Sequence, residues 1–287
     1  MAPFPDPGMK PHGVHESRSR TCATGSSYSP CMQLPDSLFL GHGAPSLALS
    51  THPANAFLRD LGRRLPRPRA VIVVSPHRMA EGFDVGHAER HRIWHDFYGF
   101  DPALHELRYD APGAPEIASA ALDGIRRAGL PGIASADARI DHGIWVPLSL
   151  IWPEAEVPVV PVASHRRDPR THLALGRALA PLVEQGCLVI GSGSLTHNLG
   201  DLELGDEFAP PQPWAQAFDD WIAEQLHAGD LDALCDYRRQ APMAEHAHPS
   251  EEHLLPLLVA CGAGGQAQAL FRGFSHGNLS LSSYAFG

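Results

Sequence analysis

Short apolar runs rich in β-branched residues alternate along this chain with stretches that carry apolar residues at helical spacing. Such alternation favours an α/β domain, in which helices pack around a mostly buried sheet. Hydrophobic residues make up 44% of the 287 residues, enough for one large core. We therefore expect a single α/β domain built on a central mixed β-sheet. The expected strands are 37–41, 70–75, 157–163, 187–192 and 279–285, and the expected helices are 114–129, 169–184, 214–240 and 252–261.

The beginning of the chain differs in composition from the rest. Residues 1–34 are rich in Pro, Ser and Gly, show no periodic pattern, and contain no apolar segment of the kind that a secretory signal needs. We expect them to form a disordered tail, with the folded domain spanning 35–287. Met32 is a second candidate for the start of translation.

Charge and cysteine content exclude several classes of protein. The formal net charge is −10 and no run of Lys or Arg stands out, which argues against nucleic acid or an anionic membrane surface as a partner. No apolar stretch approaches the roughly 20 residues needed to span a bilayer. The five cysteines are scattered and lack CxxC spacing, as expected for reduced thiols. We expect a cytoplasmic protein that acts on a small molecule.

The chain has 18 histidines, and three of them share one context. His42 follows "SLFLG" and is held between two glycines, His77 follows "AVIVVSP", and His197 follows "CLVIGSGSLT". In open α/β sheets, ligands collect beyond the carboxyl ends of the strands. Three strands that deliver histidine to this edge predict a metal site there. Imidazole suits Fe, Zn, Cu and Ni, so histidines alone do not name the ion.

Two further segments carry histidines that this site could use. His142 lies in "DHGIW", and His248 and His253 lie in "HPSEEHLLPLL". In the second segment, residues 249–252 suit the opening of a helix, which would place His253 near the N-terminus of that helix. Each histidine taken alone is compatible with an ordinary packing role. Taken together, they are better explained by one metal site than by several independent coincidences.

Five motifs occur in order along the chain: "LFLGHGAP", "VIVVSPHR", "DHGIWVPL", "GSGSLTHNL" and "HPSEEHLLPLL". In this combination they resemble the class III extradiol ring-cleavage dioxygenases, in the branch named after DOPA 4,5-dioxygenase. The resemblance extends from about residue 37 to the carboxyl end and implies that residues 35–287 form a single α/β catalytic domain. The reaction implied is cleavage of a catechol ring with O₂, which gives a muconic semialdehyde.

The resemblance also implies a set of site residues. Fe(II) would be bound by His42, His77 and His253, and members of the branch are often seen with Zn(II) in the same site. His197 would be the acid/base, close enough to act as a fourth ligand, and His142 would lie over the oxygen and the substrate. The wider class uses two histidines and a carboxylate, which makes Glu252 the rival third ligand.

The region between residues 78 and 110 is rich in histidine and aromatic residues. We expect it to form a loop over the site that sets the choice of catechol. His95, in the motif "HDFYGF", is expected to touch the substrate, with a packed aromatic loop as the alternative. His248 is a second candidate for substrate contact.

Two other functions are compatible with the same histidines. One is a zinc-dependent, amidase-like hydrolase with Glu252 as general base, although no HExxH spacing is present. The other is a non-enzymatic metal-binding or storage protein. Ser192, Ser194 and Thr196 lack the GxSxG spacing of a nucleophile and are expected to shape their turn.

Overall fold

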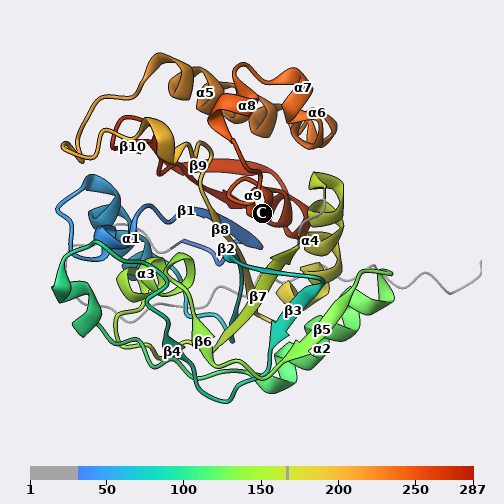
Figure 1. The fold of residues 1–287 in the computed structure, drawn as a ribbon. Coiled ribbons are helices and arrows are strands. Elements are labelled where there is room, and N and C mark those ends of the chain that lie inside the picture. The colour runs from blue at the N-terminus through green and yellow to red at the C-terminus, as the bar shows by residue number, and fades with distance from the viewer. Residues whose placement is uncertain (1–31, 166–167) are drawn as a thin grey trace, which may run out of the picture.

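A computed structural model describes residues 32–165 and 168–287 of the protein. A central sheet of eight strands runs through it in the order β5-β3-β7-β2-β8-β1-β12-β9 (Figure 1). These strands are β1 (Ser37–Gly41), β2 (Val71–Ala80), β3 (Phe83–Gly86), β5 (Gly132–Ser135), β7 (Val159–His165), β8 (Leu188–Gly193), β9 (Ala267–Phe271) and β12 (Ser283–Phe286). The expectation of a single α/β domain on a mixed sheet is confirmed.

The four middle strands of the sheet run parallel to one another, and an antiparallel pair lies on either side of them. Strands β7, β2, β8 and β1 pair in parallel, whereas β12 pairs antiparallel with both β1 and β9. Each of the four parallel strands is apolar and buried for most of its length, as strands covered on both faces must be. Their carboxyl ends therefore lie along one edge of the sheet, where the histidine site was expected.

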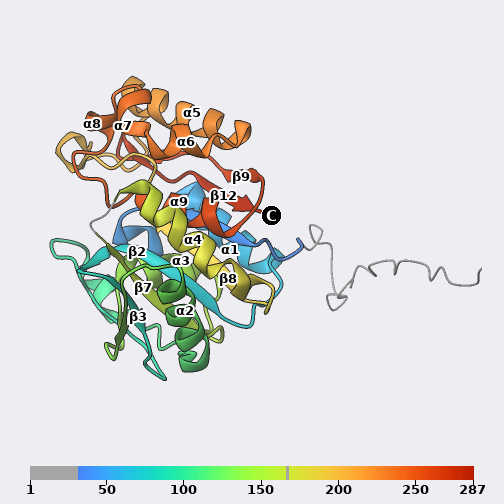
Figure 2. The same ribbon diagram turned by 90° about the vertical axis from the view of Figure 1, so that its right-hand side faces the viewer.

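Helices cover both faces of the sheet. Alternate residues of β2 and β8 point to opposite sides, so Val71 and Val73 join one core while Ile72 and Val74 join another. The first core holds α1 (Pro53–Arg64) and α3 (His142–Ile151). The second holds α2 (Pro115–Arg127), α4 (Pro169–Val183) and α9 (Leu255–Ala263), which Figure 2 shows in front of the sheet.

A further group of helices packs beyond the β12–β9 edge, at the top of Figure 1. The expected helix 214–240 is wrong, because the chain forms three helices there: α5 (Pro213–Ala228), α6 (Leu231–Cys235) and α7 (Tyr237–Gln240). Gly229 ends α5 with φ +69°, and the side chain of Asp230 accepts a hydrogen bond from the Ala233 N–H at the start of α6. The helix α8 (Ala244–Ala247) follows.

Two other expected elements differ in their bounds. The helix expected at 252–261 begins at Leu255, because Pro256 lacks an N–H and belongs in the first turn of a helix. His253 therefore lies in the turn before α9. The strand expected at 279–285 is interrupted, with β11 (Leu279–Ser280) pairing with β10 (Phe274–Ser275) and β12 following separately.

The region 78–110 is only in part a loop. Its first residues end β2, and residues 83–86 form β3 of the central sheet. Further along come the short strand β4 (Arg92–Ile93), paired with β6 (Arg139–Ile140), and the 3₁₀ helix η2 (Pro102–Glu106). Two more 3₁₀ helices, η1 (Pro45–Ala48) and η3 (Leu199–Asp201), lie elsewhere.

The predicted N-terminal tail lies almost entirely outside the described residues, so its disorder stays a prediction. Its last three residues are described, and Met32 and Leu34 pack against the core next to α1. The Met32 N–H donates to the carbonyl of Arg64 at 3.1 Å. Three cysteines of the described part, Cys187, Cys235 and Cys261, are free thiols. None of the helices that the structure describes has the length and apolar character needed to cross a bilayer.

Candidate metal centre and active site

Three histidines predicted as metal ligands converge at the carboxyl edge of the sheet. One ligand atom each from His42, His77 and His253 lie within 4.8 Å of one another. The Nε2 atoms of His42 and His77 are 3.0 Å apart. The ring of His253 lies 4.9 Å from that of His77 and 5.6 Å from that of His42, measured between centroids. This spacing suits three ligands that share one ion.

A different local backbone feature positions each of these histidines. His42 directly follows β1, and Gly43 turns the chain sharply there with φ +65°, a conformation that favours glycine. His77 lies where the pairing of β2 with β7 shifts, between Ser75 and Met79. Such a bulge re-aims side chains beside many functional sites. The histidine was expected after this strand, whereas it lies inside it.

His253 reaches the same edge because its turn is docked on the end of β8. The Ser194 N–H donates to the carbonyl of His253 at 2.9 Å. A Cβ on Gly193 would lie 2.2 Å from that same carbonyl oxygen, so only glycine permits the contact. The close approach of backbone to backbone brings residue 253 beside residue 42, although the two are far apart in the sequence.

The protonated nitrogen of His42 is set by a serine. The hydroxyl of Ser192 donates to the carbonyl of Gly143, so its oxygen is left to accept the Nδ1–H of His42 at 2.9 Å. The Nε2 of His42 then carries a lone pair directed toward His77. Such outer hydrogen bonds commonly orient histidine ligands. Ser192 was expected only to shape its turn, and its position in "GSGS" was the signal in the sequence.

The three imidazoles are neutral and fit a divalent transition metal. Burial lowers the pKa of His42, His77 and His253 well below 6.5, and neighbouring histidines lower each further. His253 is 4% exposed, and its Nε2 is buried without a hydrogen-bond partner. An orphaned lone pair beside two others is what a metal ligand presents before it binds. The donor set is compatible with Fe(II) and with Zn(II).

His197 and Glu252 both lie against His253. The rings of His197 and His253 stack with centroids 3.4 Å apart and planes 8° apart. Burial is the main cause that lowers the pKa of His197 to about 4. Glu252 faces the Nδ1 of His253 at 3.4 Å, and its carboxylate groups with His197 and His253 rather than with His42 and His77. A carboxylate at Nδ1 leaves Nε2 free for a metal, a common arrangement around histidine ligands.

His142 closes another side of the cluster. It is the first residue of α3, and its ring lies 3.8 Å from that of His77. Asp96 was not among the residues predicted from the sequence. It accepts hydrogen bonds from the backbone N–H of His142 at 3.0 Å and from the Nδ1–H of the same residue at 2.9 Å. Asp96 belongs to the motif "HDFYGF", directly after His95, so its place in this motif was the signal in the sequence.

The two histidines expected to touch substrate make their ring contacts and hydrogen bonds with residues outside this cluster. The ring of His95 packs against His105 and Trp145, which corresponds to the packed aromatic loop that was the alternative. His248 is fully buried, and its Nε2–H donates to the carbonyl of Leu195 at 2.7 Å. Substrate contact by either residue stays a prediction, and the core position of His248 does not favour it.

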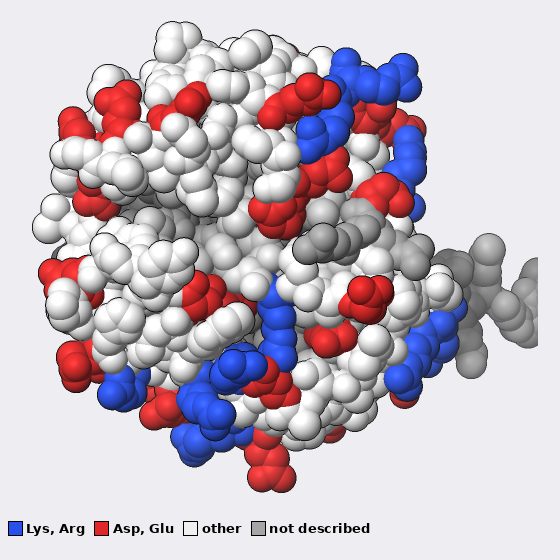
Figure 3. Space-filling view, viewed as in Figure 1, with Lys and Arg blue, Asp and Glu red and all other residues white. Residues whose placement is uncertain are grey.

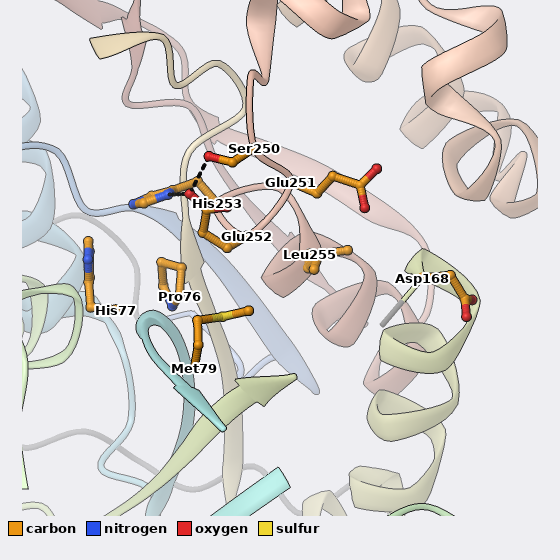
Figure 4. A pocket seen from close by; sticks show the side chains of 9 residues that line it. All are labelled: Pro76, His77, Met79, Asp168, Ser250, Glu251, Glu252, His253 and Leu255. Atoms are coloured by element: carbon orange, nitrogen blue, oxygen red, sulfur yellow. Dashed lines mark hydrogen bonds and ion pairs between the residues drawn. The ribbon is translucent and has the colours of Figure 1, made fainter. Parts of the chain in front are cut away.

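A cleft of about 730 Å³ opens beside the histidines. Figure 4 shows His77 and His253 on one side of it and Asp168 on the other, and Figure 3 shows that the centre of this face of the molecule is hollowed. This volume is ample for a ligand the size of a catechol. The lining combines apolar side chains with carboxylates: Pro76, His77, Met79, Asp168, Ser250, Glu251, Glu252, His253 and Leu255.

Comparison with known proteins identifies the family. Residues 45–287 match the family described as the catalytic LigB subunit of aromatic ring-opening dioxygenase. The chain belongs to this family. It is 36% identical to the 4,5-DOPA dioxygenase extradiol of Beta vulgaris over 88% of its length and 97% of that protein. The protein of the same name from Escherichia coli (strain K12) is 31% identical over 87% of this chain and 94% of its own.

A solved structure has the same fold. The crystal structure of an uncharacterised protein from Escherichia coli K12 superimposes with a TM-score of 0.72 at 28% identity, covering 88% of this chain and 99% of that one. Family and fold together decide among the functions that the histidines alone left open. The protein is an extradiol dioxygenase, an oxidoreductase, and the dioxygenases of this family depend on a metal.

One buried carboxyl beside the site has an unusual ionisation. Asp141 precedes α3 but does not cap it, because its carboxylate accepts the hydroxyl of Ser75 at 2.6 Å instead. The side chain is buried, and burial is the main cause that raises the pKa of this carboxyl to about 6 from its ordinary 3.8, with Asp96 as a nearby like charge. The fold therefore holds the proton on this carboxyl up to a higher pH than an exposed aspartate would.

This pKa predicts a pH-dependent effect of Asp141→Asn. A raised pKa in the fold means that the contribution of Asp141 to stability is highest below about pH 4 and is lost as pH rises through 6, at a cost of about 3 kcal/mol. Asparagine is neutral and can still accept from Ser75. The variant should therefore gain up to this free energy of unfolding at pH 8 but only about 1 kcal/mol at pH 4.5, measured by denaturant titration.

The matched control is Asp123→Asn, on the exposed side of α2, which should change stability little at either pH. Equal destabilisation by Asp141→Asn at both pH values would show that the fold requires an ionised carboxylate at this position.

Proposed function

We propose that the protein cleaves the ring of a catechol with O₂ in an Fe(II)-dependent extradiol reaction that yields a muconic semialdehyde. The metal ligands in this proposal are His42, His77 and His253. The observation that carries it is the convergence of three neutral imidazoles, one with an orphaned buried Nε2, beside a cleft of suitable size. Three ligands from the protein leave positions for the two catechol oxygens and O₂.

The residues around this site have separable tasks. Fe(II) held there would supply the electron that O₂ needs for reaction with the ring, which Zn(II) cannot supply. His197, stacked on His253, is placed to take a proton from a catechol hydroxyl and to return it later in the reaction. His142, against His77, is placed to contact the substrate from another side. Apolar residues of the cleft, including Pro76 and Met79, would pack on the ring.

The substrate in this proposal is a DOPA-like catechol. The support is the name of several relatives, 4,5-DOPA dioxygenase extradiol, among them proteins from Beta vulgaris and Portulaca grandiflora. The cleft adds support, because its carboxylates Asp168 and Glu252 would attract a protonated amino group, whereas Glu251 is paired with Arg238.

The proposal is tested by O₂ uptake of Fe(II)-loaded protein with unsubstituted catechol, DOPA and a catechol carboxylate. We expect one O₂ consumed per ring opened, both atoms of isotopically labelled O₂ in the product, and DOPA preferred over the carboxylate. Protein loaded with Zn(II) instead should take up no O₂. No uptake with any of these catechols, in protein shown to hold Fe(II), would contradict the proposal.

The ligand assignment predicts opposite effects at two adjacent residues. His253→Ala should lose most of its bound metal and its activity, as should His42→Ala and His77→Ala, because each removes one donor of a three-donor site. Glu252→Gln should keep most of its metal, since Glu252 faces the Nδ1 of His253 instead. Metal analysis of the purified variants measures this. Metal kept in His253→Ala and lost in Glu252→Gln would return the site to two histidines and a carboxylate.

Replacement of His197 separates proton transfer from binding. His197→Ala and His197→Gln should retain Fe(II) and bind catechol anaerobically, because three other imidazoles hold the metal. Turnover should fall by roughly 10² to 10⁴, the contribution of a positioned proton-transfer group. Glutamine can form hydrogen bonds but cannot shuttle a proton, so it should not rescue the rate. Loss of metal in both variants would make His197 a ligand, and near-normal turnover would remove it from the reaction.

A further inference from the structure

Asp96 makes an unusually specific contact for a loop residue. It lies between β4 and η2, and its side chain is 6% exposed. One carboxylate oxygen accepts the backbone N–H of His142 at 3.0 Å, and the other accepts the Nδ1–H of the same residue at 2.9 Å. Backbone and ring of one histidine are therefore held by a single carboxylate from a distant segment.

This contact sets which nitrogen of His142 carries hydrogen. A carboxylate accepts hydrogen bonds, so this contact places a hydrogen on the Nδ1 of His142, and in the neutral imidazole Nε2 then keeps its lone pair. The two nitrogens of an imidazole face away from each other, so Nε2 is turned away from Asp96. The N-terminus of α3 favours a negative charge at this place, and Asp141, the residue in the usual capping position, is bonded to Ser75 instead.

The ring that Asp96 holds faces the metal site. Its centroid lies 3.8 Å from that of His77 and 5.5 Å from that of His42. Phe97, next to Asp96, packs edge-on against His142 and also against Trp145 of α3. The segment that supplies the carboxylate thus also limits rotation of the ring.

We propose that Asp96 is a positioning residue of the ring-cleavage site, which holds His142 as the Nδ1–H tautomer with Nε2 free to accept a hydrogen bond from a substrate hydroxyl. The inference rests on the proposed function. Asp96 itself does not touch the substrate, and it acts through the orientation and tautomer of His142.

Asp96→Asn tests this with almost no change of shape. The backbone N–H of His142 can only donate, so it claims the single oxygen of asparagine, and the amide NH₂ then faces the ring nitrogen. The Nδ1 of His142 must become the acceptor and the hydrogen moves to Nε2. The variant should therefore present a donor where the native protein presents an acceptor.

The first measurement is long-range ¹H–¹⁵N NMR of the Zn(II)-loaded protein, which is diamagnetic, with the His142 signal identified by its absence in His142→Gln. We expect the Nδ1–H tautomer in the native protein and the Nε2–H tautomer in Asp96→Asn. The same tautomer in both proteins, or a native ring that carries its hydrogen on Nε2, overturns the proposal. The native spectrum alone decides this if the variant does not fold.

The second measurement is the kinetics of Fe(II)-loaded variants. Asp96→Asn should keep its metal and lower kcat by about 10- to 100-fold, the usual effect of losing a partner of this kind, with KM little changed. Asp96→Glu, which restores an acceptor, should recover part of the rate. Asp101→Asn is the control, since Asp101 lies in the same segment and only caps η2.

The outcomes separate this inference from the function on which it rests. Loss of metal in Asp96→Asn would make Asp96 a ligand and overturn the inference. If the native protein cleaves catechols, an Asp96→Asn variant with the same kcat would overturn it as well. If the native protein cleaves no catechol, the proposed function fails, while the tautomer measurement still reports on the contact between Asp96 and His142.

Discussion

The site depends on how closely the backbone before α9 approaches the end of β8. The carbonyl of His253 accepts the Ser194 N–H, and a Cβ on Gly193 would collide with it. In the first turn of α9, the carbonyl oxygen of Pro256 lies so near β8 that a Cβ on Gly191 would be 2.0 Å from it. Two glycines in alternate positions of one strand thus let a helix lie directly on the sheet. Without that approach, His42 and His77 would form a pair rather than a triad.

Charge explains why the surroundings of the site are acidic. Three neutral imidazoles would leave the double charge of an ion uncompensated by its own ligands. Two carboxylates lie behind imidazoles of the site: Glu252 faces the Nδ1 of His253 and Asp96 faces the Nδ1 of His142. At that distance they would polarise the imidazoles without taking up coordination positions of an ion held by His42, His77 and His253. The negative charge next to such an ion would then come from the oxygens of the substrate.

Residues whose neighbours are set by the sheet could be predicted from the sequence. His42 and His77 follow apolar runs that pair in parallel, and parallel strands share an edge, so their meeting followed from pattern alone. The ends of two helices were missed, although Gly229 and Pro256 mark them in the sequence. The contacts of Asp96 and Ser192 could not be predicted, because they join segments whose relative positions no local pattern specifies. The motif "HDFYGF" marked the segment that contacts the site, but not Asp96 as the residue that makes the contact.

The pairing of β1 has a consequence for the order in which the protein can assemble. Its neighbours on either side are β8 and β12, which come far later in the chain. During synthesis β1 cannot pair until β8 and β12 have also been made, and such non-local pairing is slow. His42 directly follows β1, so its final position is also fixed late. A metal held by His42, His77 and His253 would therefore be taken up only by the nearly complete fold, because a nascent or truncated chain would lack the assembled site.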